Sequence, residues 1–220
     1  MSHEGAHQDD TGPTCERNDR DANIDALDDR ARAVVSVLTT AAADAVRASE
    51  PGLFTAAIVG PDGVVVARCR NRVLEKCDPT AHAEIEAIRE ACRLRGSIAL
   101  DGCVLCSNAE PCPMCLSAAY WAGIRRMYYA CPKEVVAETV GFDDARLYID
   151  LALPPAQRAL MTTMRVDCPD AADAFCLWRA REASAPTGAS AISPSARAHA
   201  QDIAQENQVT LSSCPPEQQA

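Results

Sequence analysis

The sequence is poor in lysine, in aromatic side chains and in long apolar runs. Lys76 and Lys133 are its two lysines, and no basic run is longer than Arg125-Arg126. Proteins that bind nucleic acid neutralise several phosphates with Lys and Arg, so we expect no nucleic-acid partner. A membrane span needs about 18–20 consecutive apolar residues, and we expect no membrane partner either.

The N-terminal sequence also lacks the features of an export signal. Met1-Ser2-His3-Glu4 offers neither a basic segment nor the start of an apolar one, and both are typical of secretory signals. We therefore expect a cytoplasmic protein. In that reducing compartment the 12 cysteines are predicted to fill the core or bind metal rather than to form disulfides.

The negative charge is concentrated at the two ends of the chain. Residues 1–32 carry a net charge of −5 and residues 183–220 a net charge of −2, which leaves −3 of the total of −10 for the centre. Because both ends also lack a hydrophobic period, we predict a disordered acidic extension over residues 1–27 and a flexible tail over residues 183–220. One globular domain is predicted over residues 28–182.

The hydrophobic pattern of this domain predicts an α/β fold. A helix capped by Asp28 or Asp29 comes first, and a β-hairpin over residues 54–68 follows, with its turn at Pro61-Asp62-Gly63. The later part alternates strands (103–107 and 127–131) with helices (83–95, 111–122, 132–139, 147–153 and 171–180). Such alternation indicates three layers, with helices on both faces of a mixed sheet.

Two of the predicted helices begin with residues that bind metals. One begins at His82-Ala83-Glu84 and the other at Pro111-Cys112-Pro113-Met114-Cys115. Cys112 and Cys115 share one face of a helical turn, and the positive end of the helix dipole favours their thiolate forms. His82 is the one histidine outside the terminal segments. Together they supply three ligands for a tetrahedral Zn²⁺ and leave the fourth position open, as in catalytic zinc sites.

Glu84 follows the histidine by two residues, and we predict that it carries protons beside the metal. Such a carboxylate takes a proton from a metal-activated water and delivers it to the substrate. The combination of H-x-E with P-C-x-x-C is the signature of zinc deaminases. A redox C-x-x-C pair leaves the matching H-x-E unexplained. A zinc ribbon that includes Cys103 and Cys106 is disfavoured, since five residues separate the cysteine pairs instead of about 15–20.

The other cysteines and the aromatic side chains are assigned to packing. Small apolar or loop roles are expected for the cysteines, and core packing is favoured over substrate contact for the aromatic residues. These residues are Cys69, Cys77, Cys92, Cys103, Cys106, Cys131, Cys168 and Cys176, and Tyr120, Trp121, Tyr128 and Tyr129.

At these motifs the sequence resembles the cytidine deaminase-like superfamily and, within it, the bacterial-type guanine deaminases. The resemblance extends from Leu53 to Arg179 and is carried by DPTAHAEIEAIREAC, EPCPMCLSAAYWA and GFDD. HAE and PCxxC are common to the superfamily, whereas GFDD and the late FCLWR favour the guanine deaminases. The resemblance implies a three-layer α/β/α sandwich with a mixed five-stranded sheet and one Zn²⁺ per subunit.

The resemblance also implies roles for individual residues. His82, Cys112 and Cys115 would bind zinc, and Glu84 would transfer protons. The implied substrate-binding residues are Asn71 and Asp144, which hydrogen-bond the purine, Ala83, a backbone donor, and the aromatic walls Phe54, Trp121 and Phe142. The family forms a homodimer with an exchanged C-terminal segment. This sequence departs from the family pattern at Thr55 and Ser117, where the family has glycine, and lacks the aromatic residue that the family's C-terminus delivers to the partner.

The implied reaction is the hydrolytic deamination of guanine to xanthine and ammonia, with a small purine base as the substrate. Two alternatives stay open. One is a deaminase of tRNA adenosine, cytosine or a related aminopurine or triazine, although the small central charge argues against tRNA. The other is a catalytically silent zinc-fold protein that stabilises or regulates an enzyme, although such a protein has no need of Glu84.

Overall fold

The computed structural model describes the backbone of residues 19–184 and the side chains from residue 25 onward. Its sheet has the strand order β2-β1-β3-β4. The β1 strand pairs antiparallel with both β2 and β3, and β3 pairs in parallel with β4, so the sheet is mixed as predicted. The strands are β1 (Thr55–Val59), β2 (Val65–Arg70), β3 (Val104–Ala109) and β4 (Arg126–Cys131).

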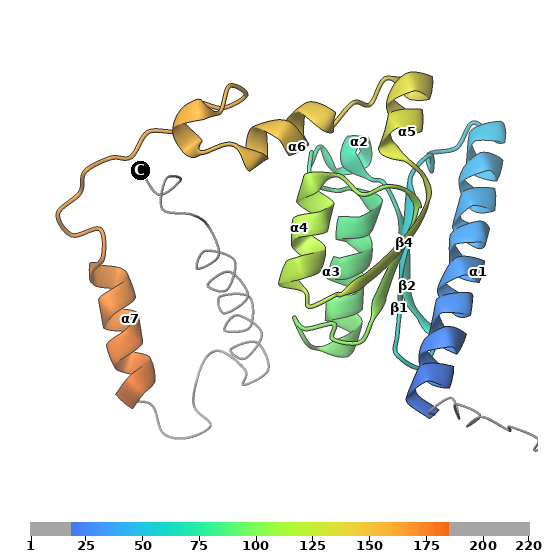
Figure 1. The fold of residues 1–220 in the computed structure, drawn as a ribbon, viewed down its shortest axis with the longest axis horizontal. Helices are drawn as coiled ribbons and strands as arrows, with labels where there is room; N and C mark the ends of the chain where they lie inside the picture. The colour runs from blue at the N-terminus through green and yellow to red at the C-terminus, as the bar shows by residue number, and fades with distance from the viewer. Residues whose placement is uncertain (1–18, 185–220) are drawn as a thin grey trace, which may run out of the picture.

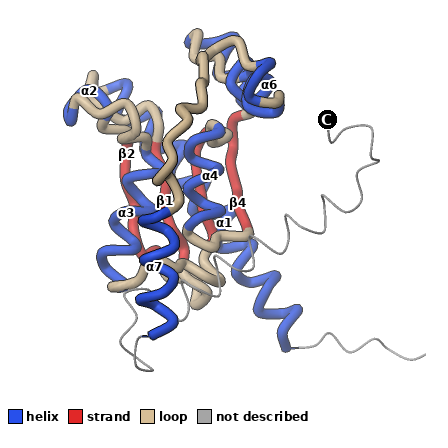
Figure 2. The backbone as a smooth tube through the Cα atoms, turned by 90° about the vertical axis from the view of Figure 1, so that its left-hand side faces the viewer, coloured by secondary structure: helices blue, strands red, loops and turns tan. Residues whose placement is uncertain are grey.

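Helices cover both faces of the sheet, which confirms the three-layer prediction (Figures 1 and 2). The helix α1 (Asp19–Arg47) packs on one face, and α3 (Ala83–Arg95) and α4 (Pro113–Trp121) pack on the other. Leu38 and Val104 are fully buried on the α1 side, and Leu105 is fully buried on the opposite side. Because full burial of such a side chain contributes about 1.5–3 kcal/mol, both faces of the sheet are firmly packed.

Three of the remaining helices lie at one end of the sheet, and the last helix lies apart from the sheet, on the side of α3 and α4 (Figure 1). A short helix, α2, follows β2, and two more, α5 and α6, follow β4. Beyond α6 the chain has a 3₁₀ turn over Pro155–Gln157, an irregular segment and α7. The bounds are Val73–Lys76 for α2, Lys133–Val140 for α5, Ala145–Ala152 for α6 and Asp173–Ser184 for α7. In the described part of the chain, no helix is long and apolar enough to cross a membrane.

The predicted fifth strand is wrong for residues 19–184, where the sheet has four strands. After β4 the chain forms α5 and α6 and then leads away from the sheet to α7 (Figure 1). Residues 162–168 adopt no regular secondary structure and are exposed. The outer edge of β4 therefore has no partner strand within the described chain.

The start of α1 also differs from the prediction, because the helix begins at Asp19 rather than at a cap on Asp28 or Asp29. The Asp28 carboxylate accepts a hydrogen bond from Arg126 of β4, at 3.0 Å. Leu27, just before it, is buried against the sheet. These contacts with distant parts of the chain explain why the helix includes residues that the sequence assigns to a disordered extension. Residues 1–18 and 185–220 of the two predicted terminal segments lie outside the described residues.

The expectation that the aromatic residues pack in the core is wrong for three of them. Trp121 is 69% exposed, and Tyr120 and Tyr129 are also exposed. Tyr128 packs partly against the core on the α1 side, where the Arg32 guanidinium lies 5.5 Å from its ring centroid.

The cysteines follow the prediction more closely. Cys103 and Cys106 are buried core residues, and Cys77, Cys168 and Cys176 are exposed. All the cysteines of the described part are free thiols. The cysteines thus give the fold no covalent cross-link within these residues.

Candidate active site

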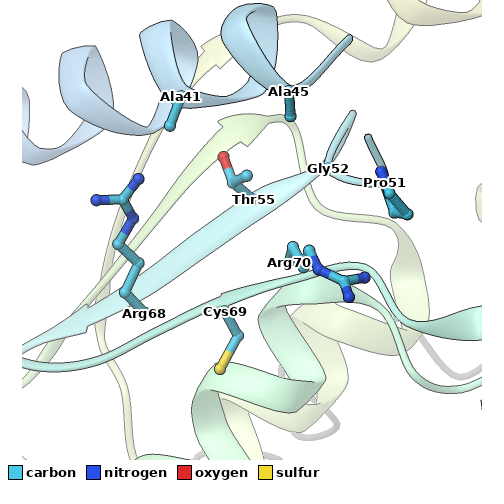
Figure 3. Close-up of a pocket in the computed structure, with 8 residues that line it drawn as sticks. All are labelled: Ala41, Ala45, Pro51, Gly52, Thr55, Arg68, Cys69 and Arg70. Atoms are coloured by element: carbon cyan, nitrogen blue, oxygen red, sulfur yellow. The ribbon is translucent and has the colours of Figure 1, made fainter. Parts of the chain in front are cut away.

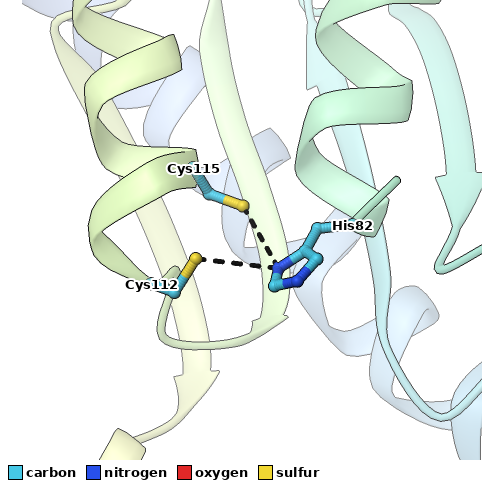
Figure 4. A group of neighbouring side chains, drawn as sticks. All are labelled: His82, Cys112 and Cys115. Atoms are coloured by element: carbon cyan, nitrogen blue, oxygen red, sulfur yellow. Dashed lines mark hydrogen bonds between the residues drawn. The ribbon is translucent and has the colours of Figure 1, made fainter. Parts of the chain in front are cut away.

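The three predicted metal ligands meet where α3 and α4 begin (Figure 4). His82 is the residue that precedes α3, Cys112 precedes α4, and Cys115 lies in the first turn of α4. The His82 Nδ1 atom is 3.6 Å from the Sγ atom of each cysteine, and the three ligand atoms all lie within 4.8 Å of one another. This arrangement brings one imidazole and two thiols to a common centre.

The spacing of these atoms fits Zn²⁺. With Zn–S bonds of about 2.3 Å, Zn–N bonds of about 2.0–2.1 Å and tetrahedral angles, nitrogen and sulfur ligands are about 3.6 Å apart. The two measured N–S distances, each 3.6 Å, have this value. The residues present therefore fit a zinc ion with three protein ligands and one open position.

Local structure explains why the ligands face one another. The side chain of Asp78 accepts hydrogen bonds from the backbone N–H and the hydroxyl of Thr80, at 2.8 and 2.7 Å, and so fixes the turn that leads to His82. On the other side of the site, Pro113 is the first residue of α4, where its fixed φ angle suits the helix and its missing N–H costs nothing. Both ligand segments are thus held by the start of a helix.

The electrostatics of the site favour the thiolate form of Cys112. A hydrogen bond with Cys115, reinforced by one with His82, lowers the pKa of Cys112 to about 4 in spite of its burial. The same interaction with Cys112, together with burial, raises the pKa of Cys115. The hydrogen bond with Cys112 also raises the pKa of His82. A metal ion that binds here displaces the proton that Cys115 holds in its absence.

Glu84 lies in the first turn of α3, two residues after the ligand His82. Its side chain is 7% exposed, and burial raises the pKa of its carboxyl group, although a hydrogen bond with the Cys115 thiol acts in the opposite direction. A carboxyl group whose pKa is raised in this way holds a proton more readily than an exposed one, as a group that carries protons to a substrate must. The structure thus places the predicted proton carrier beside the predicted ligands.

The structure also brings several of the predicted substrate-binding residues to this end of the sheet. The Phe54 and Phe142 rings meet edge to face, with their centroids 5.8 Å apart. The backbone N–H of Asn71 donates to the Phe54 carbonyl, at 2.9 Å. Asp144 is close enough to contribute to the raised pKa of His82, and burial followed by the charge of Cys112 raises the pKa of Asp144 itself.

The side-chain amide of Asn71 is oriented by a turn. Its Oδ1 atom accepts a hydrogen bond from the backbone N–H of Val73, at 3.0 Å. The Nδ2 group, which only donates hydrogen bonds, is left as the part of this amide available to a ligand. Ala83, the first residue of α3, is buried beside the ligand His82, and its N–H is one of the first-turn donors that have no partner inside the helix.

Trp121 is not brought to the site within this chain. It is the last residue of α4, whereas Cys112 precedes the first. Eight residue steps of helix separate the two ends, which corresponds to about 12 Å. The indole therefore lies at the end of α4 that is remote from the metal group.

The Thr55 side chain points away from the site. Its hydroxyl donates to the Leu38 carbonyl of α1, at 3.1 Å, and Figure 3 shows it directed toward Ala41 and Ala45 of the same helix. The replacement of the family's glycine thus places the added atoms on the face of the sheet opposite the metal group. A pocket of about 280 Å³ also lies on the α1 side, lined by Thr55 and Arg68 among others, and is separate from the metal site.

Three residues that support the site were missed by sequence reasoning. Asn108, near the end of β3, accepts a hydrogen bond from the Thr55 N–H and donates one to the Leu53 carbonyl, both at 2.8 Å, and so holds the segment that carries Phe54. The other two are Glu86 and Tyr148. An amide near the end of a strand is the one signal that could have indicated Asn108, since its partners become neighbours only through strand pairing.

Comparison with known proteins gives consistent matches. Residues 29–131 match the zinc-binding region of cytidine and deoxycytidylate deaminases. The chain is 44% identical to the guanine deaminase of Bacillus subtilis over 121 residues, which cover 55% of this chain and 76% of that protein. It is 49% identical to a tRNA-specific adenosine deaminase of Agrobacterium fabrum over 73 residues, which cover 33% of this chain and 48% of that protein.

A solved structure resembles this fold over most of its own length. The X-ray structure of the Bacillus subtilis guanine deaminase superimposes with a TM-score of 0.61 and 39% sequence identity. The superposition covers 66% of this chain and 91% of that one. The likeness therefore includes nearly all of that enzyme, whereas the adenosine deaminase match covers about half of its counterpart.

Proposed function

The chain belongs to the guanine deaminase family of zinc-binding deaminases, and we propose that it hydrolyses guanine to xanthine and ammonia. The observation that carries the proposal is the group His82, Cys112 and Cys115 with the buried carboxyl group of Glu84 beside it. Three ligands and a proton carrier in this order are what hydrolytic deamination at a ring carbon requires.

In the proposed reaction, His82, Cys112 and Cys115 would hold Zn²⁺, which would lower the pKa of a water molecule at the site. Glu84 would accept a proton from the attacking water as the water oxygen bonds to C2 of guanine, and would pass that proton to a ring nitrogen. Glu84 would then transfer the second proton of the water, from the new hydroxyl group on C2 to the amino group, which would leave as ammonia. One water is consumed, and the bond between C2 and the exocyclic amino nitrogen is replaced by a bond between C2 and the water oxygen, so the products are xanthine and ammonia.

The substrate would be held by the groups that surround the metal. The Nδ2 group of Asn71 and the backbone N–H of Ala83 would donate hydrogen bonds to acceptor atoms of the purine. The carboxylate of Asp144 would accept hydrogen bonds from its N–H groups, and the contact of Phe54 with Phe142 supplies an aromatic wall against the flat base. This set of groups recognises an uncharged purine base.

We further propose that the enzyme is a homodimer in which the C-terminal segments are exchanged. The edge of β4 is free within the described chain, and free edges pair readily with another strand. Residues 159–184 carry exposed apolar side chains, among them Met164, Val166 and Trp178. Such a series is unusual on a monomer and marks an interaction surface. A second copy offers both surfaces, so that each copy covers the other.

The assembly can be tested by light scattering coupled to size-exclusion chromatography. We expect twice the mass of one chain for the wild type, and a shift toward the mass of one chain for Val166→Asp, because the added charge would be buried in the interface between the two copies. A wild-type protein with the mass of one chain would contradict the proposal.

The similarity to tRNA-specific adenosine deaminases supports one competing substrate. The small net charge of residues 33–182 speaks against it, because a tRNA substrate needs a basic surface. A catalytically silent role is opposed by Glu84, since burial of a carboxyl group is costly and serves no purpose without proton transfer. We keep the expectation of a cytoplasmic protein as part of the proposal.

The substrate is tested by chromatography of the zinc-loaded protein after incubation with guanine, guanosine, adenine, cytosine and tRNA. We expect xanthine from guanine at a kcat/KM at least about 100-fold above that for any other substrate, since a site that leaves buried polar groups unpaired rejects an analogue by orders of magnitude. Turnover of the tRNA adenosine in place of guanine would overturn the assignment.

A further inference from the structure

A single hydrogen bond connects the helix α6 with the loop that carries a zinc ligand. The Tyr148 hydroxyl donates to the Pro111 carbonyl, at 2.7 Å. Pro111 directly precedes Cys112, and Tyr148 lies one helical turn after Asp144, the residue at the start of α6. The bond therefore joins the segment of the proposed base-recognising carboxylate to the segment of a metal ligand.

The surroundings of Tyr148 hold its ring in place. The Lys133 ammonium lies 5.5 Å from the ring centroid, and the same ammonium pairs with Glu110, at 3.3 Å. The backbone N–H of Lys133 also donates to the Glu110 carboxylate, at 3.2 Å. A cation over an aromatic face is attracted to it. Burial raises the pKa of Tyr148 to about 12, so its hydroxyl keeps the proton that it donates.

The rest of α6 offers little to fix its position. Leu147, Ile149 and Leu151 are exposed. The buried side chain of Asp150 accepts hydrogen bonds from the backbone N–H groups of Ala159 and Leu160, at 2.7 and 3.1 Å. Those contacts organise the segment that follows α6 and do not reach the metal site. The position of Asp144 relative to Cys112 thus depends on the contacts of Tyr148 and on the Phe54–Phe142 pair at the other side of the site.

We propose that Tyr148 is a positioning residue for substrate recognition: by binding the Pro111 carbonyl it holds Asp144 at the distance from the zinc ligands that the purine requires. The residue touches neither the metal ligands' donor atoms nor the base, and acts through Asp144. This inference rests on the proposed guanine deaminase function. It predicts that loss of the hydroxyl weakens the binding of the base and leaves the proton transfer by Glu84 intact.

The test is the substitution Tyr148→Phe, which removes the hydroxyl and keeps the ring. We expect the KM for guanine to rise about 5- to 10-fold, the range that corresponds to one lost hydrogen bond, with kcat within about twofold of the wild type. Zinc content by atomic absorption and the thermal midpoint should stay unchanged. Hydrogen exchange measured by mass spectrometry should become faster in peptides of residues 141–152 alone.

Two further variants make the result specific. Tyr129→Phe removes a hydroxyl from an exposed tyrosine of β4 and should leave KM and exchange as in the wild type. In an Asp144→Asn background, Tyr148→Phe should raise KM no further, because its effect is transmitted by the Asp144 carboxylate.

An unchanged KM in Tyr148→Phe, or an additive effect in the double variant, would overturn the proposal. A loss of zinc with faster exchange over the whole chain would also overturn it, since the residue would then be a general stabiliser. If the wild type forms no xanthine, the proposed function fails, and unchanged exchange in residues 141–152 would then show separately that the hydroxyl does not fix α6.

Discussion

The zinc end of the molecule and its C-terminal arm are built in opposite ways. The zinc end comprises residues 71–84 and 110–115, held by the starts of α3 and α4, and the arm comprises residues 141–184. In the zinc end, the ligand Cys115 and the proposed proton carrier Glu84 are buried. In the arm, Asp150 is the one buried side chain. The metal group is thus complete within one chain, whereas the arm that carries Asp144 depends on a few contacts for its position.

The largest expected effect comes from breaking the zinc end itself. In Cys112→Ser the hydroxyl is a far poorer zinc ligand than a thiolate. Loss of a residue that only hydrogen-bonds a metal ligand lowers metal affinity by up to about 100-fold. Loss of the ligand itself should therefore lower zinc affinity by more than about 100-fold. Deaminase activity should be lost with the metal. Competition with a chromophoric chelator measures the affinity.

Cys176→Ser is the matched control, because this thiol is exposed on α7 and is part of the arm. It should bind zinc as the wild type does. Equal zinc affinity in the Cys112 and Cys176 variants would contradict the assignment of the ligands.

The next effect concerns the ion pairs that Glu86 of α3 forms near the zinc end. Glu86 is 6% exposed, and its carboxylate lies 2.5 Å from the Lys76 ammonium and 3.2 Å from the Arg89 guanidinium. For Glu86→Gln we expect the free energy of unfolding of the metal-free protein at pH 7 to fall by about 2–3 kcal/mol, since hydrogen bonds to charged groups are lost in a buried place. Urea denaturation measures it.

The pH dependence of this effect has a definite sign. Burial on its own raises the pKa of Glu86, but the hydrogen bonds from Lys76 and Arg89 outweigh it and hold the pKa below the ordinary value of 4.5. A carboxyl group whose pKa is lower in the folded state stabilises the fold above its unfolded pKa, and this contribution disappears as the pH falls through the folded pKa. The difference between the variant and the wild type should therefore shrink below pH 4.5.

Glu90→Gln provides the comparison on the same helix. Glu90 pairs with Arg93 on an exposed surface, where such pairs contribute less than about 1 kcal/mol. A destabilisation by Glu90→Gln as large as that by Glu86→Gln would show that the zinc end has no special support from Glu86.

The smallest effect is expected in the arm. Phe142→Leu removes the ring that meets Phe54 edge to face. Because an aromatic pair contributes about 0.5–1.5 kcal/mol, the KM for guanine should rise about threefold, with kcat and zinc content unchanged. Steady-state kinetics checks this, and a fall in kcat without a change in KM would place Phe142 outside the recognition of the base.

The sequence predicted the zinc end well because its geometry is local. Cys112 and Cys115 are brought to one face by a single helical turn, and His82 and Glu84 are two residues apart at the start of α3. The positions of the two helices relative to each other follow from packing on one sheet. The three-layer fold, the mixed sheet and the bounds of α3 could therefore be predicted from hydrophobic periodicity and from the residues that begin and end helices.

Features that depend on distant or partner residues could not be predicted in this way. The start of α1 is fixed partly by the bond of Asp28 with Arg126, and the orientation of Thr55 follows from strand register. The exposure of Trp121 contradicts a prediction based on the usual burial of aromatic residues. The predicted fifth strand is absent from the described residues, where the arm leads away from the sheet. Tyr148 gives no signal at all, since its partner Pro111 lies 37 residues away.

The substitution Glu84→Gln tests whether this carboxyl group transfers the protons of the reaction. The amide keeps the size of the side chain and cannot carry the proton. We expect the variant to bind one zinc ion per chain as the wild type does, and to form xanthine from guanine at a rate lower by about 100- to 10,000-fold, the range of general acid–base catalysis. Xanthine formation at the wild-type rate by the zinc-loaded variant would contradict this role.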